Sequence, residues 1–372
     1  MTAISPTAAA TTAADVIVLS TGDVRLPLHE KAEPFAPRAE DQPYRAPQGD
    51  VELRQSVAAY TARAGAAISA DQVVVTPGAR QAIVITLRVL LEQRPEVLLP
   101  TPYWTSYPNL IGMAGGTAVR VPGTVGDGTL DVAALDAHRT ARTGAVVVNS
   151  PRNPDGAITP GHVLREVISW ADHHGIAVLF DQVYRGVALT SEPAPTIAGL
   201  YPELPDHCVL VDGLTKSHAL AGLRVGWAVI PPPLRTPVVA QASHLIGGTC
   251  GPAQDAALTA LADDVPGRIR EALTANLDRA VAALRGLPGL ECAQPASGIF
   301  LFPDLRPWLT HDAPDAARRD LSGWLKKHHR VAVVDGGHFG APGHIRLSFA
   351  VPAPQLDEGL HRLRSALEGS AQ

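Results

Sequence analysis

Lysine is scarce in this sequence of 372 residues, and only four of its 31 Lys and Arg residues are lysine. They are Lys31, Lys216, Lys326 and Lys327. Lys31 lies in the N-terminal segment, and the last two lie in a basic stretch, 324–330, typical of an exposed helix face. Lys216 instead follows the apolar run 209–211, which predicts a strand. Because a lysine amine can form a Schiff base with a carbonyl compound, Lys216 is the leading candidate for covalent chemistry.

Further polar and aromatic side chains come just after other predicted strands. These are Gly78 after Val75, Trp104 after Leu99, Asn149 and Asn153 after Val148, and Asp181 and Tyr184 after Phe180. In open parallel sheets, ligands bind outside the carboxyl ends of the strands. We therefore expect these side chains to meet Lys216 at one edge of a sheet.

The elements that would position these residues alternate between strands and helices. Strands are predicted over 73–75, 96–99, 145–148, 176–180, 209–211 and 225–230, and helices over 79–91 and 160–174. This alternation predicts an α/β fold, in which a large domain has a mainly parallel sheet covered by helices on both faces.

After about residue 231 the pattern changes. A long helix is predicted over 269–284, followed by short strands over 299–302, 331–334 and 344–348. This order is typical of a smaller α+β domain, which the predicted strand 17–19 is expected to join. We expect a flexible tail over 1–15, a segment joining the small domain over 16–43, the large domain over 44–265, and the small C-terminal domain over 266–372.

Composition excludes several classes of protein. With 46% hydrophobic residues, 18% charged residues and a net charge of -5, the chain lacks the basic character of proteins that bind nucleic acid or anionic membranes. Its three cysteines are widely spaced and its N-terminus has no basic region before an apolar one, so we expect a cytoplasmic protein. The histidine pairs 173–174 and 328–329 chelate poorly on a helix, so no metal site is expected.

The candidate residues together meet the demands of pyridoxal 5'-phosphate (PLP). Lys216 can form the Schiff base, Asp181 can pair with a protonated pyridine nitrogen, and phenol or amide groups can hold the phenolate oxygen. A phosphate needs backbone N–H groups at the start of a helix together with hydroxyl or guanidinium groups. The segment 76–80 opens a helix after a strand, and Thr215 and Arg224 flank the lysine.

From about Val18 to Ala350 the chain resembles the fold-type I PLP-dependent enzymes of the class I/II aminotransferase family, which are aspartate aminotransferase-like. The motifs that carry this resemblance are Lys216-x5-Gly222-x-Arg224-x-Gly226, Asn149-x-Pro151-x-Asn153-Pro154-x-Gly156, Asp181-x-x-Tyr184, Pro102-Tyr103-Trp104-x-x-Tyr107, Tyr44-x4-Gly49 and Ile345-Arg346-Leu347-Ser348.

The resemblance implies a role for each matching residue. Lys216 would bind the cofactor and move the substrate α-proton, and Asp181 would pair with the pyridine nitrogen. Tyr184 and Asn153 would hold the ring oxygen O3', and Trp104 would stack on the ring. The phosphate would be held by Gly78, Ala79, Arg80, Thr215 and Arg224, and by Tyr44 of a neighbouring subunit, which implies a homodimer. The substrate carboxylate would be held by Arg346, with Gly22 and Asn153 nearby.

The sequence departs from the family pattern at three places. Asp155 replaces the usual Thr before Gly156, and Asp335-Gly336 replaces a frequent Pro-Gly. Asp212 stands four residues before Lys216, where Ser or Asn is more usual, and suggests an extra carboxylate near the phosphate end.

These residues leave three hypotheses for the function. The first is a PLP-dependent aminotransferase that acts on an amino acid and a 2-oxo acid. The alternative is a PLP-dependent synthase or lyase that uses a quinonoid for β/γ-elimination or substitution, on a substrate such as S-adenosylmethionine. The third is a binding protein that has lost catalysis, against which the intact Lys216, Asp181 and Arg346 count. Specificity for the side chain is expected to lie in the loops 23–37 and 246–251.

Overall fold

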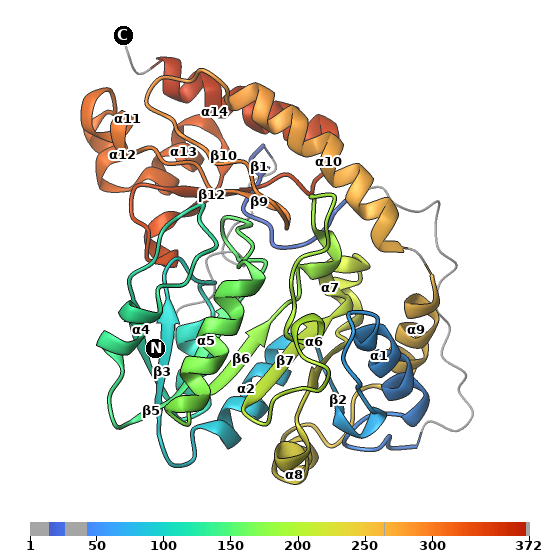
Figure 1. Ribbon diagram of the computed structural model, residues 1–372. Helices are drawn as coiled ribbons and strands as arrows, with labels where there is room; N and C mark the ends of the chain where they lie inside the picture. The colour runs from blue at the N-terminus through green and yellow to red at the C-terminus, as the bar shows by residue number, and fades with distance from the viewer. Residues whose placement is uncertain (1–14, 27–42, 264, 370–372) are drawn as a thin grey trace.

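A seven-stranded sheet organises the larger part of the chain in the computed structural model, which describes residues 15–26, 43–263 and 265–369 (Figure 1). The strand order is β2-β8-β7-β6-β5-β3-β4. The strands are β2 Val73–Thr76, β3 Glu96–Pro100, β4 Thr117–Val121, β5 Thr143–Asn149, β6 Ala177–Asp181, β7 Cys208–Gly213 and β8 Gly226–Val229. All neighbours pair in parallel except β8, which runs antiparallel to both β2 and β7. The predicted mainly parallel sheet is therefore confirmed.

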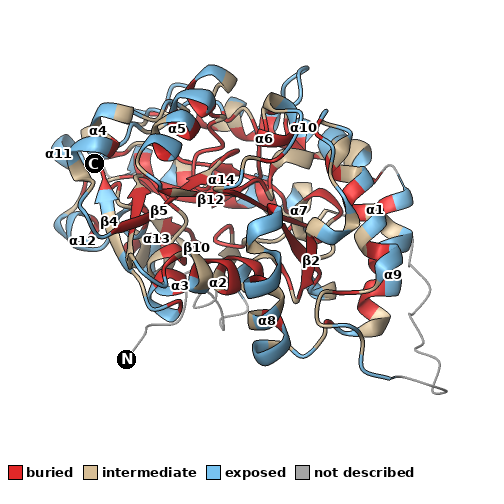
Figure 2. Cartoon of the chain, turned by 60° about the horizontal axis from the view of Figure 1, so that its bottom comes forward, coloured by how far each residue is buried: buried red, intermediate tan, exposed pale blue. Residues whose placement is uncertain are grey.

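Helices cover both faces of this sheet because its residues alternate between two cores. In β5, Val146 and Val148 join one buried cluster, whereas Ala145 and Val147 join the other. The first face is covered by α1 Val51–Ala62, α4 Val132–His138, α5 Gly161–His173, α6 Ile197–Leu200 and α9 Gly251–Ala262. The second is covered by α2 Ala79–Leu90, α3 Tyr107–Met113 and α8 Arg235–Leu245. Figure 2 shows the central strands buried between these layers.

A separate hydrophobic core unites the C-terminal part with the N-terminal segment. Its strands are β1 Ile17–Val18, β9 Phe300–Leu301, β10 Val331–Ala332, β11 Val334–Asp335 and β12 Ile345–Ser348. Its helices are α10 Val265–Leu284, α11 Arg306–His311, α12 Asp315–Arg319, α13 Leu321–His329 and α14 Ala353–Gly369. β1 pairs in parallel with β10, so the predicted N-terminal strand does join this part (Figure 1). The single strand predicted over 331–334 is two strands with different partners, β10 and β11.

The chain passes from the sheet to the second core between α9 and α10. Helix α9 packs into a core of the sheet, and α10 packs into the second core. We therefore propose the division into a large domain, 44–265, and a small domain, 266–372, with 16–43 joining the latter. Apart from Asp15, the expected tail 1–15 lies outside the described residues, as do residues 27–42.

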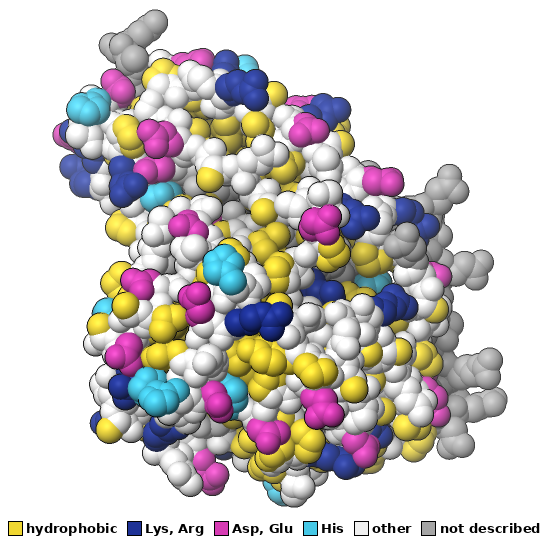
Figure 3. All heavy atoms as spheres, in the orientation of Figure 1, with side chains coloured by type: hydrophobic (Ala, Val, Ile, Leu, Met, Phe, Trp, Pro, Cys, Tyr) yellow, Lys and Arg dark blue, Asp and Glu magenta, His cyan; other side chains and the backbone are white. Residues whose placement is uncertain are grey.

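Figure 3 shows basic and acidic side chains interspersed over the face seen in Figure 1. No helix in the described ranges has both the length and the apolar character that crossing a membrane requires.

Candidate active site

A cavity of about 390 Å³ opens at the carboxyl ends of the parallel strands, between the sheet and the second core. All but two of the predicted site residues line it: Gly22, Ala79, Arg80, Trp104, Asn153, Asp181, Tyr184, Thr215, Lys216, Arg224 and Arg346. Gly78 lies directly before Ala79, at the start of α2. Tyr44 is fully exposed and lies outside this cavity.

Lys216 enters the cavity from a short helix, α7 Leu214–Ser217, that follows β7 without a loop. Glycine at position 213 allows this close passage, because a Cβ there would lie 2.9 Å from the Cα of Gly226 in the neighbouring strand. The Lys216 amine donates a hydrogen bond to the Gly22 carbonyl. Burial lowers the pKa of Lys216 to about 8, and the charge of Asp23 partly opposes this effect. The amine is therefore partly neutral, and so nucleophilic, near pH 8.

Asp181, the last residue of β6, forms the floor of the cavity. Its carboxylate accepts hydrogen bonds from the Tyr107 hydroxyl at 2.7 Å and from the Val183 backbone N–H at 3.2 Å. Burial nevertheless raises the pKa of Asp181 to about 6. A buried carboxylate of this kind is stabilised by an adjacent cation, which a protonated pyridine nitrogen would supply.

Tyr107 is a residue that sequence reasoning missed as part of the site, although it belongs to one of the motifs. It is the first residue of α3 and is buried against the second face of the sheet. Its ring lies edge-on to Trp104, with centroids 5.3 Å apart. The motif spacing alone did not indicate which aromatic residue would reach the end of β6.

Arg346 faces Lys216 from the second core. Its guanidinium donates a hydrogen bond to the Asn153 side chain at 2.9 Å and lies 3.9 Å from the centroid of the Phe300 ring. The Asn153 amide is in turn 3.5 Å from the Tyr184 hydroxyl. Burial lowers the pKa of Arg346 to about 10, so it remains a cation at neutral pH. A planar guanidinium held in this way can bind a carboxylate through two parallel hydrogen bonds.

The other end of the cavity is suited to an anion. Helix α2 begins here, and its N-cap, Gly78, has a φ of +83°. A Cβ at Gly78 would collide with the Arg224 guanidinium, so glycine is needed for this approach. Burial and the charge of Arg224 both lower the pKa of Arg80, whose guanidinium lies 4.7 Å from the centroid of the Trp104 ring. Two guanidinium groups beside a helix N-terminus favour a phosphate.

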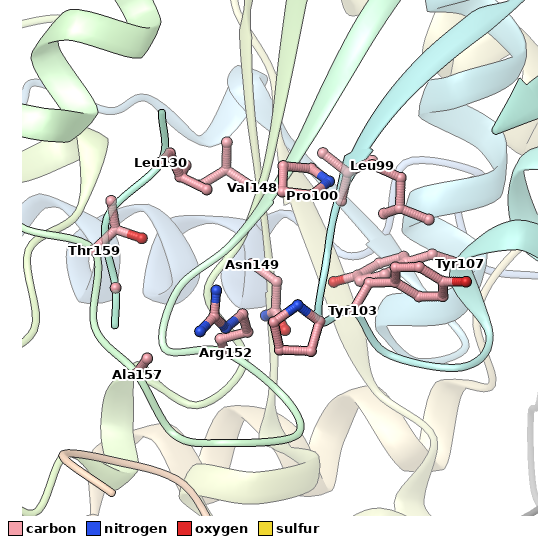
Figure 4. Close-up of a pocket in the computed structure, with 13 residues that line it drawn as sticks. Leu99, Pro100, Tyr103, Tyr107, Leu130, Val148, Asn149, Arg152, Ala157 and Thr159 are labelled. Atoms are coloured by element: carbon pink, nitrogen blue, oxygen red, sulfur yellow. The ribbon is translucent and has the colours of Figure 1, made fainter. Parts of the chain in front are cut away.

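Asp155, one of the departures, has a structural partner. Its buried carboxylate forms two hydrogen bonds with Arg152, from Nε at 2.9 Å and from Nη2 at 2.5 Å. Arg152 also donates to the backbone carbonyls of Thr124 and Asp127. Figure 4 shows Arg152 at a smaller cavity that Asn149 and Tyr107 also line. The pair thus fixes the turn that carries Asn153 to the loop before α4.

Loss of the ion pair between Arg152 and Asp155 should make the protein less stable to unfolding. We expect Asp155→Ala to lower the free energy of unfolding by about 3 kcal/mol, because it leaves the Arg152 charge buried without its partner. Urea unfolding measures this change. The control is Asp357→Ala, which removes an ion pair whose two side chains are each 53% exposed, and which should cost less than about 1 kcal/mol. Equal effects of the two substitutions would contradict the assignment.

Asp212, the other carboxylate near the lysine, does not line the cavity. It is buried on the opposite face of β7 from Val211, and it accepts hydrogen bonds from the Gly213 N–H at 2.7 Å and from the Gln182 amide at 3.1 Å. The carboxylate expected near the phosphate end therefore does not face the cavity. Since side chains alternate along a strand, a residue next to Val211 points to the other face of the sheet. Instead, Asp212 joins the end of β7 to the end of β6.

The comparisons with known proteins agree with this geometry. A family model described as "Aminotransferase class I and II" matches residues 14–363. The aspartate aminotransferase of Streptomyces avermitilis is 32% identical over 85% of this chain and 79% of its own length. The arginine–pyruvate transaminase of Pseudomonas aeruginosa is 31% identical over 94% of this chain and 89% of its own length.

A solved structure gives the same result for the fold. The aspartate aminotransferase of Thermotoga maritima has a TM-score of 0.85 and 29% identity, over 95% of this chain and 92% of its own. This agreement confirms the fold-type I architecture expected from the sequence. Together with the family match over nearly the whole length, it shows that this chain belongs to the class I and II aminotransferases.

Proposed function

We propose that this transferase exchanges an amino group between an amino acid and a 2-oxo acid, with PLP held in the cavity. The observation that carries the proposal is that one cavity brings together the Lys216 amine, the buried carboxylate of Asp181 and the fixed cation of Arg346. When bound, PLP supplies an aldehyde that accepts the amino group and a ring that withdraws electrons from the substrate.

The residues present fit this cofactor. Lys216 would bind the aldehyde carbon and then carry the substrate's α-proton, for which an amine of lowered pKa is suited. Asp181 would hold the proton on the ring nitrogen. The neighbouring Tyr184 and Asn153 would donate to the ring oxygen. The phosphate would lie at the start of α2, among Ala79, Arg80, Thr215 and Arg224.

The names of the relatives favour amino transfer over the alternative synthase or lyase. Both curated relatives are transaminases by name, but one name specifies aspartate and the other arginine, at 32% and 31% identity. Identity to these proteins therefore does not assign the side chain of this chain's own substrate.

The experiment that tests the proposal uses the purified protein loaded with PLP. We expect at least one amino acid of a broad panel to convert the bound cofactor to its pyridoxamine form, and 2-oxoglutarate or another 2-oxo acid to reverse this. Arg346→Lys should mainly raise KM, by roughly tenfold or more, because a lysine ammonium cannot form the two parallel hydrogen bonds that a guanidinium makes with the α-carboxylate. Elimination products without any pyridoxamine phosphate would support the alternative.

We also propose a cytoplasmic homodimer in which Tyr44 completes the phosphate site of its partner. The support is that Tyr44 matches the family motif, is fully exposed and lies outside its own chain's cavity. Tyr44→Phe should weaken PLP binding by about tenfold, as expected for a lost hydrogen bond to a charged group. Equilibrium dialysis measures this affinity. An active monomer in analytical ultracentrifugation, or an unchanged affinity, would contradict the proposal.

A further inference from the structure

The wall of the cavity contains a carboxylate for which the chemistry proposed above has no use. Among the described lining residues, the charged side chains are Asp23, Arg80, Asp181, Lys216, Arg224 and Arg346. The two arginines beside α2 face the phosphate end, Arg346 serves the α-carboxylate, and Asp181 serves the ring nitrogen. Among these described charged residues, Asp23 is the one to which no role has been given, and it is available to contact the substrate's side chain.

Asp23 is held in place by its neighbours. Thr21 and Val24 are buried, and the Arg25 backbone N–H donates to the Ala350 carbonyl at 2.8 Å. The backbone N–H of Asp23 donates to the Thr21 hydroxyl at 3.2 Å. The preceding residue, Gly22, accepts the hydrogen bond from the Lys216 amine. Asp23 therefore directly follows the residue whose carbonyl holds the Lys216 amine, and its charge acts on that amine.

The ion pair that Asp23 forms within the chain is easily exchanged. Arg25 donates to its carboxylate at 3.2 Å, and the side chains are 53% and 47% exposed, respectively. Exposed pairs of this kind are weak and are screened by salt. The carboxylate also acts on the Lys216 amine, since its negative charge partly offsets the lowering of the Lys216 pKa by burial. A cation inside the cavity can therefore replace Arg25 at little cost.

We infer that Asp23 binds the positively charged end of the substrate's side chain, and hence that the amino donor is a basic amino acid with a terminal amino or guanidino group. This inference rests on the function proposed above. Opposite charges attract more strongly in a partly desolvated cavity than in water, whereas a second substrate carboxylate would be repelled by Asp23.

Binding of compounds that cannot react tests the inference directly. 5-Guanidinovalerate is arginine without its α-amino group, 5-ureidovalerate is its neutral counterpart, and adipate is a dicarboxylate of similar length. By calorimetry on the PLP-loaded protein, we expect 5-guanidinovalerate to bind roughly 10- to 100-fold more tightly than 5-ureidovalerate, as for a charged hydrogen bond. Asp23→Asn should remove most of this difference. Tighter binding of adipate than of 5-guanidinovalerate would overturn the inference.

Two further variants separate recognition from a structural effect. Arg25→Gln removes the competing cation and should tighten binding of 5-guanidinovalerate by roughly two- to fivefold. Asp357→Asn changes an ion pair of similar exposure, with Arg279, on helices of the second core, and should leave binding unchanged. Weaker binding in Arg25→Gln, or an equal loss in Asp357→Asn, would contradict the inference.

Reaction rates distinguish failure of this inference from failure of the proposed function. We expect arginine or lysine to convert the cofactor at least tenfold more efficiently than citrulline or norleucine, respectively. Asp23→Asn should abolish this preference, so that it lowers the efficiency with arginine at least tenfold more than the efficiency with alanine. If Asp23→Asn slowed alanine as much as arginine, Asp23 would act through Lys216 and the inference would be wrong. If alanine or aspartate reacted without any preference for cations, only the inference would fail. If no amino acid reacted, the proposed function itself would fail.

Discussion

Lys216→Ala is expected to lower the rate of amino transfer by roughly 10³-fold or more, because it removes both the covalent anchor and the base. The same variant should lose α-proton exchange between the substrate and deuterated water. Borohydride treatment of the loaded wild-type protein should fix the cofactor on the peptide that contains Lys216, as mass spectrometry would show.

Lys327→Ala is the matched control, because Lys327 is exposed in the last turn of α13 and does not line the cavity. It should retain full activity. Cofactor fixed on a peptide with Lys326 or Lys327 would contradict the site assignment. So would exchange of the α-proton at the wild-type rate in Lys216→Ala.

Asp181→Asn is expected to lower the rate by roughly 10²- to 10³-fold, as for the loss of a preorganised charge in a buried site. An amide can still accept the hydrogen bond from Tyr107, but it cannot hold a proton on the ring nitrogen. The absorption spectrum of the bound cofactor should change with the activity. Unchanged rate and spectrum would remove Asp181 from the proposed mechanism.

The same variant has an opposite effect on the stability of the protein without cofactor. Burial raises the pKa of Asp181 from 3.8 to about 6, which corresponds to about 3 kcal/mol. This cost of folding is absent below pH 3.8, grows as the pH rises, and is complete above pH 6. Asp181→Asn should therefore stabilise the cofactor-free protein at pH 8, by up to about 3 kcal/mol, and have little effect near pH 3.5. A loss of stability at pH 8 would show that the variant disturbs packing instead.

The sheet and most of its cavity could be predicted from the sequence because two simple rules apply. Buried parallel strands are continuous apolar runs, and the polar residues after them meet at one edge. The predicted strands over 96–99, 145–148 and 176–180 correspond to β3, β5 and β6. β4 was not predicted, since it lies at the edge of the sheet and only one of its five residues is buried, so it has no apolar run to detect (Figure 2).

The side-chain contacts that the sequence did not predict depend on where each side chain points in the folded protein. Arg152 pairs with Asp155 across a turn. Tyr107, on α3, reaches Asp181 at the end of β6, 74 residues along the chain. No local periodicity reports either contact. Two of the three departures from the family pattern have structural partners of this kind: Asp155 stabilises a turn, and Asp212 joins two strand ends.

The cavity takes its residues from two hydrophobic cores, and this division has an evolutionary consequence. The groups that would hold the cofactor, such as Asp181 and Lys216, come from the sheet, whereas Arg346 and Asp23 are anchored on the second core. Substitutions on the second core can therefore change the groups proposed to hold the substrate while the sheet that carries Asp181 and Lys216 stays in place.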